Sequence, residues 1–299
     1  MIDQYYENQV KLLIKCLSTI LKEECFAIKG GTAINIFCCD LPRLSVDIDL
    51  VYLPIEDRDT TIENINNALG RIQNNLMKIG LTTHSTGKDI LKLTCSDGVA
   101  QIKIEPNYTL RGYIYEPQIM EVCNKVQKLY GYAKARIISE AELWGGKICA
   151  ALDRQHPRDL FDIKNLFSTT GITEDIKRGF ISLLLGGNRP LHEMLDPNFQ
   201  MQETTLKAEF EGMTENVFTF EEAKAVFNRL VNEIKLALSE DDKQLLLDFV
   251  QLRADLSKSI IPNLDKLPGI QWKIKNLENL RDTNMKKFQE QYEKLKAIL

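Results

Sequence analysis

The residues that most clearly suggest chemistry are two carboxylates in an apolar strand pattern. In RLSVDIDLVYL, residues 43–53, Asp47 and Asp49 stand two positions apart among valine, isoleucine and leucine. Residues i and i+2 of a strand point to the same face, which places the two Cβ atoms roughly 7 Å apart. A divalent cation held by both carboxylates and by phosphate oxygens would offset their repulsion. The alternative is that both aspartates lie on a solvated sheet face.

A glycine turn precedes this strand. The pattern predicts a short strand at residues 25–29 and a helix of about two turns at residues 32–39, with Gly30 and Gly31 between them. Unpaired N–H groups and the positive dipole end at the start of a helix bind phosphate. Such a turn can equally serve only to reverse the chain. Its place about fifteen residues ahead of the two carboxylates predicts a triphosphate site beside a metal site.

Two later segments add charged residues. In QIKIEPN, Lys103 and Glu105 share one strand face, although Glu105 could be an exposed residue at a strand end. The segment ELWGGKICAALDRQHPRDLFDI has helical spacing and contributes Lys147, Arg158, Asp159 and Asp162. Alternatively, these residues are ordinary charges on a helix surface, where an ion pair stabilises the helix by only tenths of a kcal/mol. In that interpretation Glu142 closes a capping box with Ser139.

The elements expected to position these residues form two groups, which predict an α+β fold. An α/β domain with a mixed sheet spans residues 1–137, and an all-α domain spans residues 138–299. In the first, helices are predicted at 2–24, 32–39 and 60–80, and strands at 25–29, 43–53, 81–86, 90–95 and 99–106, with a hairpin turn at Ser96-Asp97-Gly98. In the second, helices are predicted at 139–168 with a break near His156-Pro157, and at 174–185, 219–239, 240–256 and 273–297, while 186–218 is a polar connector.

Composition excludes several classes of protein. The 299 residues include 38 basic and 42 acidic side chains, so a net charge of -4 gives no field that attracts nucleic acid or an anionic membrane. Neither a signal peptide nor a membrane-spanning stretch is visible, which predicts a cytoplasmic protein. Seven scattered cysteines favour reduced thiols. The segment 273–299 has seven basic residues against four acidic ones, a balance that a solvated helix explains as well as RNA binding does.

Together, the motifs resemble the nucleotidyltransferase superfamily built on the DNA polymerase β-like palm. KGGTA, RLSVDIDL, IKIEP and the helical segment at 142–163 occur in this order over roughly residues 25–165. This combination is similar to the AbiEii/AbiGii toxins, nucleotidyltransferases of type IV toxin–antitoxin and phage abortive-infection systems. The resemblance implies a polymerase-β-like domain followed by a helical domain that contributes to the active-site cleft.

The resemblance also implies roles for single residues. It implies three metal ligands that take part in catalysis, Asp47, Asp49 and Glu105, and two further catalytic residues, Lys147 and Asp162. The nucleotide-binding set that it implies comprises Lys29, Gly30, Gly31, Thr32, Arg43, Ser45, Lys103, Lys147, Arg158 and Asp159.

The chain departs from the family pattern in two places. Thr32 stands where the family often has serine, a change that keeps the hydroxyl. Gly145 and Gly146 precede Lys147, although glycine costs about 1 kcal/mol relative to alanine within a helix. A close approach of a ligand or of another backbone segment would explain them.

The activity implied by the resemblance is nucleotidyl transfer. An acceptor hydroxyl attacks the α-phosphorus of a nucleoside triphosphate, pyrophosphate leaves, and Mg²⁺ or Mn²⁺ is the cofactor. Lys147 would neutralise charge on the pyrophosphate. RNA is the expected acceptor, with tRNA 3′ ends as the family precedent, and a cognate antitoxin or repressor encoded nearby is the expected partner. Two alternatives stay open: transfer to a protein or a small molecule, and a nucleotide-binding module without turnover.

Overall fold

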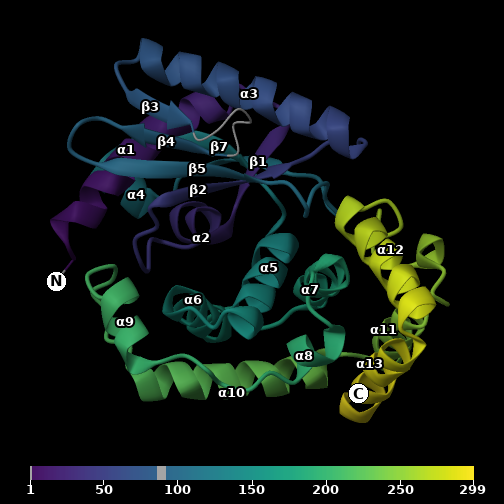
Figure 1. Cartoon of the computed structure of the whole chain (residues 1–299). Coiled ribbons are helices and arrows are strands. Elements are labelled where there is room, and N and C mark those ends of the chain that lie inside the picture. The colour runs from purple at the N-terminus through teal and green to yellow at the C-terminus, as the bar shows by residue number, and fades with distance from the viewer. Residues whose placement is uncertain (1, 86–91) are drawn as a thin grey trace. The chain divides into compact units, whose positions relative to one another are not determined.

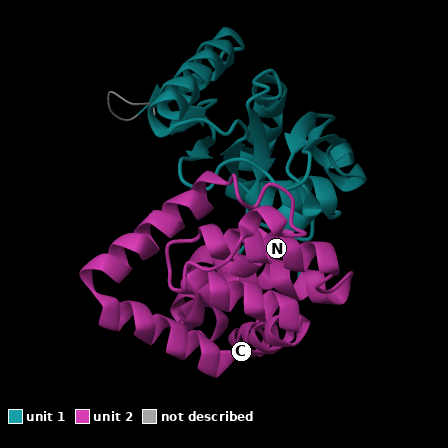
Figure 2. Cartoon of the chain, turned by 90° about the vertical axis from the view of Figure 1, so that its right-hand side faces the viewer, with its two compact units in different colours: residues 1–143, 210–217 teal, residues 144–209, 218–299 magenta. Residues whose placement is uncertain are grey.

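The computed structural model describes residues 2–85 and 92–299. Within these residues the chain forms two compact units, coloured separately in Figure 2. Unit 1 comprises residues 1–143 and 210–217, and unit 2 comprises residues 144–209 and 218–299. Parts of two predicted strands, namely residue 86 and residues 90 and 91, lie outside the described residues.

The described residues of unit 1 form a seven-stranded mixed sheet with the order β3-β4-β5-β2-β1-β7-β6. β2 pairs in parallel with β5 and antiparallel with β1, while β1 pairs in parallel with β7. The predicted hairpin turn joins β4 to β5, which are antiparallel. The strands are β1 (Phe26–Lys29), β2 (Asp47–Tyr52), β3 (Thr82–Ser85), β4 (Leu93–Ser96), β5 (Gln101–Asn107), β6 (Gln118–Glu121) and β7 (Lys134–Ile137).

Helices α1 (Gln4–Ile20) and α3 (Arg58–Lys78) cover one face of the sheet, and α2 (Gly30–Thr32) lies on the other (Figure 1). A π-helical segment, Ala33–Cys38, continues α2. Unit 1 also contains α4 (Asn124–Tyr130) and the start of α5 (Glu140–Asp153). The core of the unit lies between the sheet and the α1–α3 layer, because the apolar stripes of both helices are buried there.

Unit 2 consists of the rest of α5 and eight further helices among the described residues. α7 packs against α12, and α6 packs against α10. These helices are α6 (Pro157–Ser168), α7 (Glu174–Gly186), α8 (Leu191–Leu195), α9 (Glu203–Phe210), α10 (Phe220–Ala237), α11 (Glu240–Val250), α12 (Pro268–Thr283) and α13 (Met285–Ile298). A mixed sheet followed by helices confirms the predicted α+β fold class.

The close approach of the α5 and α7 backbones explains the first of the two adjacent glycines in α5. A Cβ added to Gly145 would lie 2.3 Å from the backbone nitrogen of Phe180 and 2.4 Å from the carbonyl carbon of Gly179, both in α7. Because no side chain fits in that space, glycine is required at this crossing. At Gly146 the nearest atom would be a Leu183 methyl carbon at 3.3 Å, a tight contact that a flexible side chain can relieve.

Four predicted elements differ from those observed. The helix predicted at 240–256 ends at Val250, two residues before Leu252 with its φ of +59°. The connector at 186–218 contains α8 and α9. The single helix predicted at 273–297 is two helices, because Asn284 (ψ 73°) interrupts the helical backbone. The strand predicted at 43–53 begins only at Asp47, because the preceding residues bond outside the sheet, as described below.

Two predictions made from composition can be compared with the structure. All seven cysteines are free thiols, with Cys16 and Cys95 buried and the other five partly buried. Among the helices of the described residues, none combines the length and the apolar character needed to cross a membrane.

Candidate active site

The two aspartates of β2 lie on the sheet face opposite α1 and α3. Asp47 and Asp49 are half-buried, while Ile48 and Leu50 between and beside them are fully buried. The Asp49 carboxylate lies against Gly30 of α2, which fixes the face to which both aspartates point. The strand periodicity therefore predicted their orientation correctly, and the apolar residues hold the strand from the other side.

Neighbouring strands place charged residues of both signs opposite the two aspartates. In the parallel pairing of β2 with β5, Asp47 is opposite Lys103 and Asp49 is opposite Glu105. From β1, Lys29 is opposite Asp49. Paired residues of adjacent strands have side chains on the same face, so these five charged residues share it.

The carboxylates suit a hard cation, with one limit on the donor set. Mg²⁺ and Mn²⁺ prefer carboxylate oxygens, and Asp47 and Asp49 supply two carboxylates from one strand face. Glu105 forms an ion pair with Lys92 at 3.7 Å. In the described part of the chain, no three histidine, cysteine, aspartate or glutamate side chains lie close enough together to hold a metal ion by themselves. A cation here would therefore take its remaining ligands from phosphate oxygens or water.

The glycine turn fits against this carboxylate pair because it has no side chains. Gly30 has a φ of +70°, a region that favours glycine, and a Cβ added there would lie 2.5 Å from Asp49 Oδ2. A Cβ added to Gly31 would lie 2.7 Å from Arg43 Nη2 and 3.1 Å from Ser45 Oγ. The backbone of the turn thus approaches a carboxylate on one side, and a guanidinium and a hydroxyl on the other.

Three polar side chains hold the turn in place. The Thr32 hydroxyl is buried, donates to the Asp47 carbonyl and lies 3.0 Å from Ser45 Oγ. The Asn35 amide donates to the Gly31 carbonyl at 2.9 Å. The sequence-based set did not include Asn35, although an amide within the apolar run AINIF was a usable signal. Arg43 is 3% exposed and donates from Nη1 to the Leu44 carbonyl at 2.9 Å.

A second group of predicted residues gathers in unit 2, between α5 and α6. Lys147 Nζ lies 2.7 Å from Asp159 Oδ1 and 2.9 Å from Asp162 Oδ2, and all three side chains are buried. Arg154, which was not in the predicted set, also pairs with Asp159 at 2.7 Å. Burial alone would raise the pKa of Asp159, but Lys147 and Arg154 outweigh burial and hold this pKa well below its usual range.

The local contacts also decide two of the alternatives. One half of the predicted capping box is present, since the Ser139 hydroxyl accepts the Glu142 backbone N–H at 3.2 Å. The Glu142 carboxylate accepts the Ser139 hydroxyl at 2.8 Å and the backbone N–H of Ile114 at 3.0 Å. Burial raises the pKa of Glu142, and its hydrogen bonds oppose that rise. Lys147 is not a solvated helix charge, since it is 6% exposed. At the N-terminus of α6, the Arg158 backbone N–H donates to the His156 ring at 3.2 Å.

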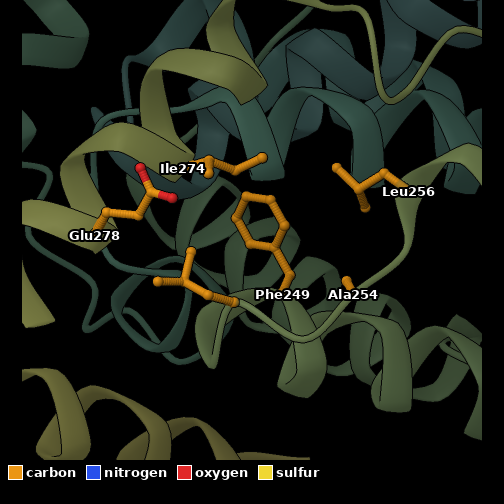
Figure 3. A pocket seen from close by; sticks show the side chains of 6 residues that line it. Phe249, Ala254, Leu256, Ile274 and Glu278 are labelled. Atoms are coloured by element: carbon orange, nitrogen blue, oxygen red, sulfur yellow. The ribbon is translucent and has the colours of Figure 1, made fainter.

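The structure thus brings the predicted residues together in two groups. The group of unit 1 comprises Lys29, Gly30, Gly31, Thr32, Arg43, Ser45, Asp47, Asp49, Lys103 and Glu105. The group of unit 2 comprises Lys147, Asp159 and Asp162, while Arg158, also in unit 2, contacts His156. A small pocket elsewhere in unit 2, of about 100 Å³, contains none of them (Figure 3). Its walls are apolar apart from Glu278, so it lacks the cationic groups that a triphosphate needs.

Comparison with known proteins identifies the family. The family model for the nucleotidyl transferase AbiEii toxin of type IV toxin–antitoxin systems matches residues 11–275. MenT4, a nucleotidyltransferase toxin from Mycobacterium tuberculosis H37Rv, has a similar fold, with a TM-score of 0.63 at 14% identity over 91% of this chain and 94% of that one. A putative nucleotidyltransferase from H. pylori aligns with a TM-score of 0.45 at 18% identity, over 78% of this chain and 96% of that one.

No curated protein matches the chain. The family match covers most of the sequence and includes the glycine turn, the carboxylate pair and the charged helical segment. This chain belongs to the AbiEii family of nucleotidyltransferase toxins of type IV toxin–antitoxin systems.

Proposed function

We propose that this nucleotidyltransferase moves a nucleoside monophosphate from a nucleoside triphosphate to a hydroxyl of RNA, in a reaction that depends on Mg²⁺ or Mn²⁺. The observation that carries the proposal is the packing of the glycine turn between Asp49 and Arg43. A Cβ added to Gly30 would lie 2.5 Å from Asp49 Oδ2, and a Cβ added to Gly31 would lie 2.7 Å from Arg43 Nη2. A phosphate-binding backbone and a carboxylate pair thereby share one face of the sheet. This arrangement supports binding of a triphosphate together with its cation.

The glycine turn supplies the contacts to the triphosphate. Because glycine has no side chain, the backbone N–H groups of this turn can approach phosphate oxygens closely, as they do in the glycine-rich turns of other nucleotide sites. The Arg43 guanidinium beside Gly31 adds positive charge next to these groups. Lys29 and Lys103 add two more cationic side chains on the same sheet face. The expected reaction forms a P–O bond from the acceptor hydroxyl to the α-phosphorus and breaks the bond to the β-phosphate oxygen, which releases pyrophosphate.

Asp47 and Asp49 would hold the cation together with phosphate oxygens, and Glu105 would join them as a third ligand only if its side chain moved away from Lys92. When bound, the cation would stabilise charge on the phosphate oxygens and lower the pKa of the attacking hydroxyl. The residues of the chain orient its ligands: the Thr32 hydroxyl fixes the Asp47 backbone, and Gly30 lets phosphates bound at the turn lie next to Asp49.

Lys147, Arg158, Asp159 and Asp162 are proposed as the contribution of the helical domain, residues 138–299. Lys147 is held between two buried carboxylates, so a direct role at the leaving pyrophosphate requires this ammonium to exchange one of these partners. The alternative consistent with these contacts is that the group fixes α5 against α6.

The acceptor is tested by the fate of two labels. We would incubate the protein with α-labelled or γ-labelled nucleotides, Mg²⁺ and total RNA, and compare wild type with Asp49→Asn. Asp59→Asn, at an exposed aspartate in the first turn of α3, is the matched control. The proposal predicts α-label on RNA for wild type and Asp59→Asn, but not for Asp49→Asn, and no γ-label on RNA.

Other outcomes separate the competing functions. Transfer of α-label to protein or to a small molecule would replace RNA as the acceptor. Nucleotide binding without any transfer would support a module without turnover. Toxicity is tested by expression in a bacterium, where wild type should arrest growth, Asp47→Asn should not, and a cognate antitoxin gene should relieve the arrest.

A further inference from the structure

A short segment from the helical half of the sequence belongs to unit 1. Residues 210–217, called the strap below, are grouped with the sheet, although residues 144–209 before them and residues 218–299 after them form unit 2. Phe210 and Met213 of the strap are 4% and 3% exposed. The strap is therefore packed into unit 1.

The strap bonds to the peptide groups on both sides of Arg43. The Thr214 hydroxyl donates to the Pro42 carbonyl at 2.8 Å, and the Leu44 N–H donates to the Met213 carbonyl at 2.7 Å. The first bond holds the peptide plane before Arg43, and the second holds the plane after it. Since each peptide unit is planar, holding both planes fixes the two backbone dihedral angles of Arg43.

Arg43 in turn contacts the glycine turn. Its Nη2 would lie 2.7 Å from a Cβ on Gly31, and its Nη1 donates to the Leu44 carbonyl at 2.9 Å. The guanidinium is buried, so its position depends on the backbone that carries it. A rotation of either peptide plane at Arg43 would move the cationic group away from Gly31.

The strap has its own anchor at the start of α1. The Asp3 N–H donates to the Gly212 carbonyl at 2.9 Å. Gly212 has a φ of +80°, and a Cβ added there would lie 2.9 Å from Asp3 Cβ. Because the strap is fixed at this point as well, the segment that bonds to the peptide groups on both sides of Arg43 is itself held in place.

We propose that the strap is a positioning element that holds Arg43 against the glycine turn and thereby sets the affinity of this turn for a nucleoside triphosphate. This inference rests on the proposed function, since it assigns the turn to triphosphate binding. Thr214 acts through Arg43 and is a positioning residue.

The test measures equilibrium binding of a labelled nucleoside triphosphate in the presence of Mg²⁺. Thr214→Val removes the hydroxyl at nearly constant shape, and with it the bond to the Pro42 carbonyl and the bond from the exposed Asn216 N–H at 3.1 Å. Since only the first reaches the Arg43 backbone, binding should weaken about five-fold, the equivalent of one net hydrogen bond. Thr214→Ser should restore wild-type affinity. Thr204→Val makes the same change at an exposed threonine of α9 and should have no effect.

A double-mutant cycle with Arg43→Ala separates positioning from general loss of structure. If Thr214 acts through Arg43, Thr214→Val should add nothing once Arg43→Ala has weakened binding. An equal loss in both backgrounds would overturn the inference, and so would wild-type affinity in Thr214→Val. If the wild-type protein binds no nucleoside triphosphate, the proposed function fails first, and this result is distinct from either of the others.

Discussion

The glycine turn of unit 1 and the ion cluster of unit 2 handle charge in opposite ways. At the turn, Asp47 and Asp49 are half-buried on one strand face, and the absence of a side chain at Gly30 lets its backbone lie close to Asp49. In the cluster, Lys147, Asp159 and Asp162 are 6%, 1% and 0% exposed, and the two carboxylates are matched by the cations of Lys147 and Arg154.

We infer from this difference that the turn binds a ligand and that the cluster fixes α5 against α6. A half-exposed carboxylate pair on one strand face carries a repulsion that a bound cation would offset. A buried cluster whose charges already balance must break an ion pair before any ligand can bind, and an unpaired buried charge is costly. Substitutions in the turn should therefore affect chemistry more than stability, and substitutions in the cluster should do the reverse.

The largest effect on stability is expected for Lys147→Met. This change leaves Asp159 and Asp162 buried without their shared ammonium, so the free energy of unfolding should fall by about 3 to 5 kcal/mol. Urea denaturation measures it. The control is Lys207→Met, which removes an exposed pair with Glu203 and should cost no more than about 1 kcal/mol.

Lys147→Met also tests whether the ion cluster has only a structural role. A variant that keeps wild-type stability but loses nucleotidyl transfer would show that this ammonium acts on the substrate, as the family resemblance implied. The division between a chemical turn and a structural cluster would then be wrong.

The next effect is expected for Asp49→Asn, on rate alone. Removing one of the two carboxylates should lower the rate of pyrophosphate release on the order of 10²-fold or more. Thermal unfolding should be unchanged or slightly improved, because the change removes the repulsion between two carboxylates on one strand face. Unfolding at a clearly lower temperature would mean that Asp49 mainly stabilises the sheet.

A smaller effect is expected for Gly30→Ala. The new methyl group would meet Asp49 Oδ2 at 2.5 Å, and a φ of +70° costs a residue with a Cβ roughly 1 to 2 kcal/mol. Both stability and affinity for a nucleoside triphosphate should fall. Gly80→Ala is the matched control, since Gly80 has a φ of +82° and nothing within 4 Å of its added Cβ. It should show the backbone strain without the loss of affinity.

The parts of the site that follow local periodicity could be predicted from the sequence. The two-residue period placed Asp47 and Asp49 on one strand face, and it placed Lys103 and Glu105 correctly because β5 keeps the same period. The glycine pair predicted a turn because glycine adopts backbone angles closed to other residues, and Gly30 has such a φ.

Contacts between distant segments could not be predicted in this way. Thr214 bonds to Pro42 across 172 positions, and no periodicity links two loops. The strand predicted from residue 43 begins at Asp47 for the same reason, because the Leu44 N–H bonds to the strap. Arg154 was left out of the predicted set because its pairing with Asp159 depends on how α5 turns into α6.

The smallest expected effect is the change in the free energy of unfolding that Asp159 of the cluster causes when the pH varies near neutrality. The pKa of Asp159 is lowered in the folded protein, so this group favours the folded state when it is ionised in both states. Its contribution is fully present above the pKa of an unfolded aspartate, about 3.9, and is lost as the pH falls toward the lowered pKa. The contribution of Asp159 to the free energy of unfolding should therefore be nearly constant between about pH 6 and 8 and should decrease below about pH 4. Urea titrations of wild type and Asp159→Asn measure this, and the variant should be less stable at pH 7 but lose less stability on acidification. Parallel curves for the two proteins would assign the acid sensitivity to other carboxylates and remove Asp159 from the balanced cluster.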